Sequence, residues 1–316
     1  MKPAIAVVGN VWPEAFLDAL SAEFDCHFPG RMLDAERAAF FAGTAARVRG
    51  FLTTGTVGID AATADRFPSL EIVAVHGVGV DPVDLPAMAA RGIAVTNTPD
   101  VLTEDVADLA VALLLTAARR LPFLDRYVRD GHWLEKRPLL PTRSLRGKVA
   151  GIYGYGRIGQ AVAGRLRAFG MEIRYYQRSS GQAPELRSAS LLELARESDY
   201  LVACAPGGLE TRHAIDAAVL DALGPEGTLV NIARGSVVDE AALVAALTGG
   251  RLGAAALDVF EDEPQVPPAL LRLDNVVLSP HVGSLTVEAR QAMRELCLAN
   301  LRAHFAGQPV LTPVGA

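Results

Sequence analysis

The chain has 316 residues, of which 50% are hydrophobic and 21% charged, a composition typical of a globular protein. This length exceeds what one hydrophobic core usually serves, so two domains are expected. A formal net charge of −6 argues against nucleic acid or an anionic membrane as the main partner, although a local cationic pocket could still hold a small anionic substrate.

The cysteine pattern and the apolar segments indicate a compartment. The three cysteines, Cys26, Cys204 and Cys297, form no CxxC pair, which suits a reducing environment. The first apolar run is too short for a secretory signal, and no stretch has the length and apolarity of a membrane span. No HxxxH pair or Cys/His cluster indicates a metal site. We therefore expect a cytoplasmic protein without a metal.

Short apolar, β-branched runs alternate with Ala/Leu/Arg-rich segments, a pattern typical of βα units that build parallel sheets. The first expected elements are strands at 5–8, 50–53, 71–75 and 93–96, with helices at 13–23 and 61–66. One long helix is expected at 102–130, with Thr103 as its N-cap before two acidic residues. Its length suits an element that links two domains.

A second set of strands is expected after the polar stretch 137–148. Its members are 149–153, 172–176, 200–203, 228–232, 254–258 and 276–278. Six strands with intervening helices match the count of a dinucleotide-binding sheet. A C-terminal helix at about 286–305 follows the completed sheet, so we expect it to pack back on the first domain, which makes that domain discontinuous.

A glycine motif lies between an expected strand and an expected helix. Gly154 permits a tight turn, Gly156 lets the backbone approach a pyrophosphate, and Gly159 permits close helix–strand packing. The helix that begins at Arg157 and Ile158 offers free N–H groups to the phosphates. The motif alone also fits a glycine-rich turn, but the strand before it and the helix after it favour a dinucleotide site.

The end of the next expected strand indicates which dinucleotide. NAD-dependent enzymes usually carry Asp or Glu there to accept from the ribose hydroxyls. This chain has Gln177, followed by Arg178 and Ser179, which can donate to a 2′-phosphate. The alternative is that Arg178 is a solvated loop residue. We expect NADP(H) to be preferred, with NAD(H) as a second cofactor.

Three residues after strand ends have the chemistry for hydride transfer to a 2-oxo acid. Arg234 can hold a carboxylate, His281 can donate a proton near neutral pH, and Glu263 can tune that histidine. Taken singly, Arg234 is better explained as a surface arginine, Glu263 as a solvated acidic residue, and His281 as a capping or core histidine. Together with the glycine motif they predict an active site at the sheet edge that binds ligands.

Long blocks of the chain resemble the D-isomer-specific 2-hydroxyacid dehydrogenase family. In chain order these are VHGVGVDPVDL, NTPDVLTEDVADLAVALLL, GIYGYGRIG, NIARGSVVDEAAL, ALDVFEDEP and SPHVGS. The segments YYQRSS and NLRAHFAGQPVLTPV are most similar to the NADP(H)-preferring glyoxylate/hydroxypyruvate reductases, including the hydroxyphenylpyruvate reductase type.

The resemblance implies an α/β fold of two domains that close over the substrate. A Rossmann-type dinucleotide-binding domain would span 99–283, and a discontinuous flavodoxin-like substrate domain would comprise 1–98 and 284–316. The implied reaction is NADPH-dependent reduction of a small 2-oxo acid, of the glyoxylate or hydroxypyruvate type, to the D-2-hydroxy acid, and the reverse oxidation.

The resemblance also implies roles for individual residues. Arg234 would bind the substrate carboxylate and carbonyl, His281 would be the general acid/base, and Glu263 would pair with His281. The remaining implied contacts are Val78, Gly79 and Ser284 for substrate, and Thr103, Pro206, Ala233, Asp258 and Gly283 for the nicotinamide. A homodimer is implied near Trp133, with Lys136 or Arg137 as candidates to reach a neighbouring active site.

Two departures and two alternatives remain open. Pro206 is followed by two glycines where relatives often have Leu-Thr, and His76 replaces an apolar or small residue. His76 either contributes to substrate choice or is a partly buried histidine, and we favour the second. The alternative functions are a corepressor-like nicotinamide sensor of the same fold, or another family member acting on phosphoglycerate or D-lactate.

Overall fold

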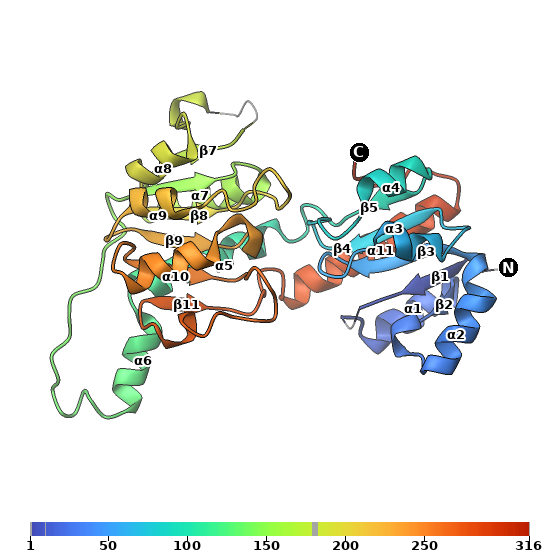
Figure 1. Cartoon of the computed structure of the whole chain (residues 1–316), viewed down its shortest axis with the longest axis horizontal. Coiled ribbons are helices and arrows are strands. Elements are labelled where there is room, and N and C mark those ends of the chain that lie inside the picture. The colour runs from blue at the N-terminus through green and yellow to red at the C-terminus, as the bar shows by residue number, and fades with distance from the viewer. Residues whose placement is uncertain (1, 10, 179–182, 316) are drawn as a thin grey trace. The chain divides into compact units, whose positions relative to one another are not determined.

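The structure is a computed structural model that describes residues 2–9, 11–178 and 183–315. The chain divides into two compact units, Met1–Leu102 with Thr286–Ala316 (unit 1) and Thr103–Leu285 (unit 2). Each unit contains its own parallel sheet with helices packed against it, as Figure 1 shows. The predicted α/β class with a discontinuous first domain is confirmed, and the sequence places the two boundaries slightly earlier, at 98/99 and 283/284.

Unit 1 is built on a five-stranded sheet in the order β2-β1-β3-β4-β5, which is the flavodoxin-like order. Its strands are β1 Ala4–Val7, β2 Asp25–His27, β3 Val48–Thr54, β4 Ile72–His76 and β5 Ala94–Thr96. Its helices are α1 Glu14–Glu23, α2 Asp34–Ala42, α3 Ala61–Asp65, α4 Leu85–Ala90 and α11 Val287–Phe305. The four expected strands of this unit are present, and β2 is an additional edge strand without an apolar run.

The C-terminal helix α11 packs in unit 1, as predicted. Its side chains Cys297, Leu298 and Leu301 share one buried cluster with Ile5 of β1 and Ile72 of β4. The helix begins after Thr286, whose hydroxyl accepts a hydrogen bond from the backbone N–H three residues later. The last helix of the sequence therefore completes the core of the first domain.

Unit 2 is built on a six-stranded sheet in the order β11-β10-β9-β8-β6-β7. Its strands are β6 Val149–Tyr153, β7 Glu172–Tyr176, β8 Tyr200–Ala203, β9 Thr228–Asn231, β10 Ala254–Leu257 and β11 Val276–Leu278. Its helices are α5 Thr103–Ala118, α6 Leu121–Arg129, α7 Arg157–Ala168, α8 Leu191–Glu197, α9 Ala217–Leu223 and α10 Glu240–Thr248. Each of the six predicted strands is present at the expected place.

The edge of this sheet shows why its order differs from a complete Rossmann sheet. Beyond β7, a single parallel bridge joins Tyr175 to Arg187. We count this bridge as a strand and number the strands of unit 2 from 1 to 7 in chain order, starting with β6. Their order along the sheet is then 3-2-1-4-5-6-7, and the first six follow the Rossmann order. The strand order reverses between β6 and β8, which are parallel neighbours, and ligands bind in open α/β sheets at the carboxyl ends of the strands at such a switch point.

The predicted helix at 102–130 is wrong, because the structure has two helices there. α5 ends at Ala118, and α6 begins at Leu121 after Arg120, whose φ of +52° is left-handed. Pro122 has no N–H and its ring clashes with a preceding helical turn, so a continuous helix cannot pass through it. Thr103 is the first residue of α5, so it does not precede the helix as an N-cap.

Among the described residues, no helix combines the length and the apolar character needed to cross a bilayer.

Candidate active site

The glycine motif adopts the geometry that a dinucleotide requires. Gly154 follows β6 with a φ of +94°, and a Cβ there would lie 2.5 Å from the backbone nitrogen of Ala205. A Cβ on Gly159 would lie 2.1 Å from the carbonyl oxygen of Gly154, so α7 packs directly on the turn. A Cβ on Gly156 would have no atom within 4 Å, so the N-terminus of α7, at Arg157 and the following Ile158, opens to a space that can take a pyrophosphate.

The two residues directly after β7, Gln177 and Arg178, provide an amide and a guanidinium group but no carboxylate. The side chain of Gln177 accepts from the N–H of Tyr155 in the glycine turn at 3.2 Å. Arg178 forms an ion pair with Glu210, and both side chains are exposed. Ser179, the third predicted contact, lies outside the described residues. These residues fit a 2′-phosphate better than a free ribose hydroxyl, because a cation is present and no carboxylate follows the strand.

His281 and Glu263 are hydrogen-bonded to each other, as the sequence predicts. The Nδ1 atom of His281 lies 2.8 Å from Oε2 of Glu263, and the other carboxylate oxygen accepts from the N–H of Phe260 at 3.1 Å. Burial raises the pKa of Glu263, but the hydrogen bond and charge of His281, the Phe260 N–H and the charge of Arg234 together hold it below its usual value.

An ionised Glu263 fixes the tautomer of its partner. Because a carboxylate only accepts, the Nδ1 atom of His281 must donate to it. Among the residues that the structure describes, Nε2 of His281 has no hydrogen-bond partner. This nitrogen is therefore the one able to exchange a proton with a substrate oxygen.

Asp258 organises the turn that presents His281, a role that the sequence did not reveal. Its carboxylate accepts from the hydroxyl of Ser279 at 2.6 Å, and from the N–H groups of Val282 and Gly283 at 2.9 Å each. Its carbonyl oxygen accepts from the N–H of His281 at 2.7 Å. Asp258 is 1% exposed, and His281 has a left-handed φ of +53°. These bonds hold the histidine in a conformation that a free turn rarely adopts.

Arg234 follows β9, the strand between β8 and β10. Its Nη1 atom donates to the carbonyl oxygen of Ala233 at 2.7 Å, and its own carbonyl oxygen accepts from the side chain of Asn231 at 2.9 Å. A Cβ on Gly235 would lie 1.9 Å from the carbonyl group of Phe260, so only glycine lets the two loops approach this closely. The close approach brings Arg234 to the segment that contains Glu263, whose pKa it helps to lower.

The three predicted catalytic residues therefore come from one edge of one sheet. Arg234, Glu263 and His281 follow β9, β10 and β11, which are neighbours in the sheet, and the carboxyl ends of parallel strands meet at the same edge. The predicted nicotinamide contacts Pro206, Ala233, Asp258 and Gly283 follow β8 to β11 at that edge, and Thr103 begins α5, which packs against β9 and β10.

The predicted substrate contacts of unit 1 lie in the turn after β4. The carbonyl oxygen of Val78 accepts from the side chain of Asn97 at 2.8 Å. Within the described ranges, the N–H groups of Val78 and Gly79 have no acceptor in the protein, so they can bind an anion. Ser284 follows the His281 turn in unit 2 and is partly exposed. No group of three or more His, Cys, Asp or Glu that could hold a metal occurs in the part of the chain that the structure describes.

Comparison with known proteins gives consistent matches over the chain. Residues 111–283 match the family model of the D-isomer specific 2-hydroxyacid dehydrogenase, NAD binding domain. Over 270 residues, 51% are identical to glyoxylate/hydroxypyruvate reductase A of Arabidopsis thaliana, covering 84% of this chain and 85% of that protein. Over 276 residues, 51% are identical to hydroxyphenylpyruvate reductase of Plectranthus scutellarioides, covering 87% and 88%.

A solved structure extends the similarity to the fold of the whole chain. The NADPH-dependent glyoxylate/hydroxypyruvate reductase of Sinorhizobium meliloti, in complex with NADP and malonate, matches with a TM-score of 0.91 and 44% identity. The match covers 100% of this chain and 97% of that one.

Proposed function

The chain belongs to the D-isomer-specific 2-hydroxyacid dehydrogenase family, and on this premise we propose that it uses NADPH to reduce small 2-oxo acids to D-2-hydroxy acids. The substrates are of the glyoxylate and hydroxypyruvate type, and the same residues perform the reverse oxidation. NADP(H) is the preferred cofactor and NAD(H) a second one. The similarity to reductases of these substrates, one of them with NADP bound, supports the assignment.

The hydrogen bond between His281 and Glu263, with the charge of Arg234 acting on the same carboxyl group, is the observation on which the proposal depends most. Arg234 binds the substrate carboxylate and polarises its carbonyl group, because a guanidinium is always charged and donates two parallel hydrogen bonds. Bound NADPH supplies the hydride. His281 donates a proton from Nε2 to the carbonyl oxygen as negative charge develops there, and Glu263 stabilises the imidazolium form that donates it.

Residues of both units make the other contacts of the proposal. The residues that hold the cofactor are Gly154, Gly156, Arg157, Ile158, Gly159, Gln177, Arg178, Ser179, Thr103, Pro206, Ala233, Asp258 and Gly283. The further residues that hold the substrate are Val78, Gly79 and Ser284. The open space at Gly156 supports the pyrophosphate position. Asp258 acts mainly on the His281 turn, because both its carboxylate oxygens already accept bonds from that turn.

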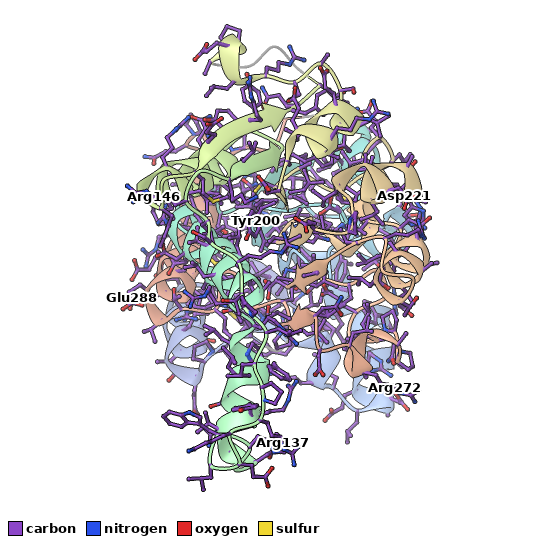
Figure 2. All side chains as sticks on the ribbon, turned by 90° about the vertical axis from the view of Figure 1, so that its left-hand side faces the viewer. Arg137, Arg146, Tyr200, Asp221, Arg272 and Glu288 are labelled. Carbon is purple, nitrogen blue, oxygen red and sulfur yellow. The ribbon has the colours of Figure 1, made fainter. Side chains whose placement is uncertain are left out.

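The protein acts as a homodimer through α6 and the segment after it. These elements expose large apolar side chains, namely Leu121, Val128, Trp133, Leu134, Leu139 and Leu140. An apolar surface of this kind on a soluble protein usually marks an interface. Figure 2 shows Arg137 at the far end of this segment, well away from Tyr200 in the sheet of unit 2. Light scattering tests the dimer: a mass twice that of the chain supports it, and the mass of one chain contradicts it.

The cytoplasm is the proposed location. Cys26, Cys204 and Cys297 are all free thiols, which supports a reducing compartment.

The test of the function is NADPH and NADH oxidation by the purified protein with glyoxylate, hydroxypyruvate, hydroxyphenylpyruvate and pyruvate. Rapid NADPH-dependent turnover of glyoxylate or hydroxypyruvate supports the proposal. Tight NADPH binding without turnover of any of the four acids contradicts it and favours a nicotinamide-sensing protein of the same fold.

A further inference from the structure

His76 occupies the ligand-binding edge of the sheet in unit 1, on the face that α11 covers. Successive residues of a strand point to opposite faces, so His76 shares its face with Ile72 and Ala74. Both belong to the buried cluster that includes Leu298 and Leu301 of α11. Ile72 and Ala74 pack in the apolar core, whereas His76 is placed on the same face at the carboxyl end of β4.

Two arginines of α11 face this histidine. Arg290 and Arg294 are one helical turn apart, and the row continues at Leu298 in the core. Both arginine charges act on His76. The ring of Trp12 packs edge-on against the His76 ring, with 5.2 Å between centroids. The side chains spaced four residues apart on this face of α11 are therefore apolar at Leu298 and cationic at Arg294 and Arg290, nearer the start of the helix.

The cluster contains buried polar atoms that lack partners. His76 is 3% exposed, and within the described ranges both its ring nitrogens and the Nε atom of Arg290 are buried without a hydrogen bond. Buried polar atoms of native proteins are almost always hydrogen-bonded. Three such atoms in one cluster indicate that a partner from outside the chain completes it.

The chemistry of these atoms defines that partner. Burial, with the charges of Arg290 and Arg294 adding to it, lowers the pKa of His76 to about 4, so its ring is neutral and offers one donor and one acceptor. The Nε atom of Arg290 offers a further donor. A hydroxyl group can pair two of these atoms at once, because it donates to the acceptor nitrogen of the ring and accepts from the guanidinium. A carboxylate only accepts, so it would leave the acceptor nitrogen unpaired.

The cluster adjoins the turn of Val78 and Gly79, whose N–H groups, free within the described ranges, we propose to hold the substrate carboxylate together with Arg234. His76 directly precedes that turn, and its carbonyl oxygen accepts from the N–H of Gly55 at 3.2 Å. Gly77 and Thr98 exchange two hydrogen bonds, of 3.0 and 2.9 Å, which fix the start of the turn. A substituent on the third carbon of a bound 2-oxo acid is only a few bonds from the carboxylate, so its partner is sought among the residues that adjoin this turn.

We propose that His76 and Arg290, with Arg294 beside them, form a specificity-determining site that hydrogen-bonds a hydroxyl group on the third carbon of the substrate. The inference rests on the proposed function and names its substrate class as 3-hydroxy-2-oxo acids. It takes up the first of the two interpretations of His76 that the sequence left open, a contribution to substrate choice, in place of a partly buried histidine.

Steady-state kinetics with NADPH test the site. The substrates are hydroxypyruvate, pyruvate, which lacks the hydroxyl, and glyoxylate, which lacks the third carbon. In His76→Phe, the ratio of kcat/KM for hydroxypyruvate to that for pyruvate is expected to fall by about tenfold or more, mainly through KM, because a site built for a hydroxyl discriminates by its hydrogen bonds. The loss for glyoxylate is expected to be several-fold smaller.

Two further variants keep the test decisive. Arg290→Met is expected to lower the same ratio and replaces His76→Phe if that variant does not fold. His76→Asn keeps a donor and an acceptor and is expected to recover part of the ratio. Arg302→Met is the matched control, because Arg302 is on the same helix, exposed and paired with Glu23, and its loss leaves the ratio unchanged.

The outcomes separate the inference from the proposed function. If the wild type reduces glyoxylate but His76→Phe and Arg290→Met keep the wild-type ratio, the specificity site is wrong and the function stands. Oxaloacetate, which has a carboxylate on the third carbon, is assayed as a fourth substrate. If the wild type prefers it to hydroxypyruvate, the ligand group is a carboxylate and the hydroxyl assignment is overturned. If the wild type reduces none of these acids, the proposed function itself fails.

Discussion

The carboxyl edges of the two sheets differ in how their polar groups are satisfied. In unit 2, Asp258 accepts three hydrogen bonds from the turn around His281, and His281 is bonded to Glu263. In unit 1, His76 and Arg290 place buried nitrogens in a cluster that gives them no partner among the described residues. Both edges lie where open α/β sheets bind ligands.

This difference separates groups that perform a reaction from groups that choose a substrate. A proton donor must be held in one orientation before substrate arrives, and the bonds around His281 do this within the protein. A group that recognises a substituent is completed by that substituent, so its partner is absent until it binds. The contrast explains why paired polar groups in unit 2 and unpaired ones in unit 1 can belong to one enzyme.

The largest effect is expected for a substitution in the active site of unit 2, where the polar groups are already hydrogen-bonded within the protein. Arg234→Ala should lower kcat/KM for glyoxylate by about a thousandfold, because a charge-assisted contact to the substrate is lost. The Kd for NADPH should change little, since the arginine acts on the substrate. Fluorescence titration and initial rates measure the two quantities. Arg272→Ala, an exposed arginine of the same unit labelled in Figure 2, is the control. An equal loss of cofactor binding and turnover would remove Arg234 from the substrate site.

A smaller effect, on cofactor preference, is expected for substitutions at the end of β7, which lies at the same edge of the unit 2 sheet. Gln177→Asp combined with Arg178→Ala introduces a carboxylate for the ribose hydroxyls and removes the cation that favours a 2′-phosphate. The ratio of kcat/KM with NADPH to that with NADH should fall by about tenfold or more. Replacing Glu210, the ion-pair partner of Arg178, by Gln is expected to leave NADPH preferred. A ratio that stays at the wild-type value in the double variant would show that these residues do not select the cofactor.

The smallest effect is expected on the stability of the fold, and it tests the buried His76 of unit 1. The pKa of His76 is about 4 in the folded protein, below its usual 6.5, so the unfolded chain binds the proton first as the pH falls. The wild type should therefore lose stability between about pH 6.5 and 4, by up to about 3 kcal/mol. His76→Phe should lose less over this range, because it has no ring to protonate. Urea unfolding at pH 7 and pH 4.5 measures the difference, and an identical loss in both proteins would place His76 in a hydrated or paired environment.

Much of the fold was predictable because its signals are local. The expected strands are apolar runs bounded by polar residues, and Gly154, Gly156 and Gly159 follow one of them at a fixed spacing. The family and the two-domain α/β class are confirmed for the same reason. The break between α5 and α6 was also signalled locally, by Pro122, but the apolar periodicity on either side concealed it.

The candidate site was predictable only in its residue types. Arg234, Glu263 and His281 each follow a strand, so the parallel sheet brings them to one edge. The three bonds of Asp258 and the burial of the Nε atom of Arg290 were not predictable, because they depend on which segments meet in three dimensions. An arginine is exposed by default, and nothing in its sequence neighbourhood indicates that a helix turns it toward a buried histidine. The homodimer and the cofactor contact of Ser179 remain predictions.

Glyoxylate reduction by Glu263→Gln, measured beside the wild type, tests the central claim most directly. The amide keeps the shape of the side chain but replaces the carboxylate that accepts from Nδ1 of His281 and lies beside the proton donor. We predict that kcat/KM for glyoxylate falls by about a hundredfold while the Kd for NADPH stays at the wild-type value. A kcat/KM equal to that of the wild type would contradict the assignment of His281 as the proton donor with Glu263 as its partner.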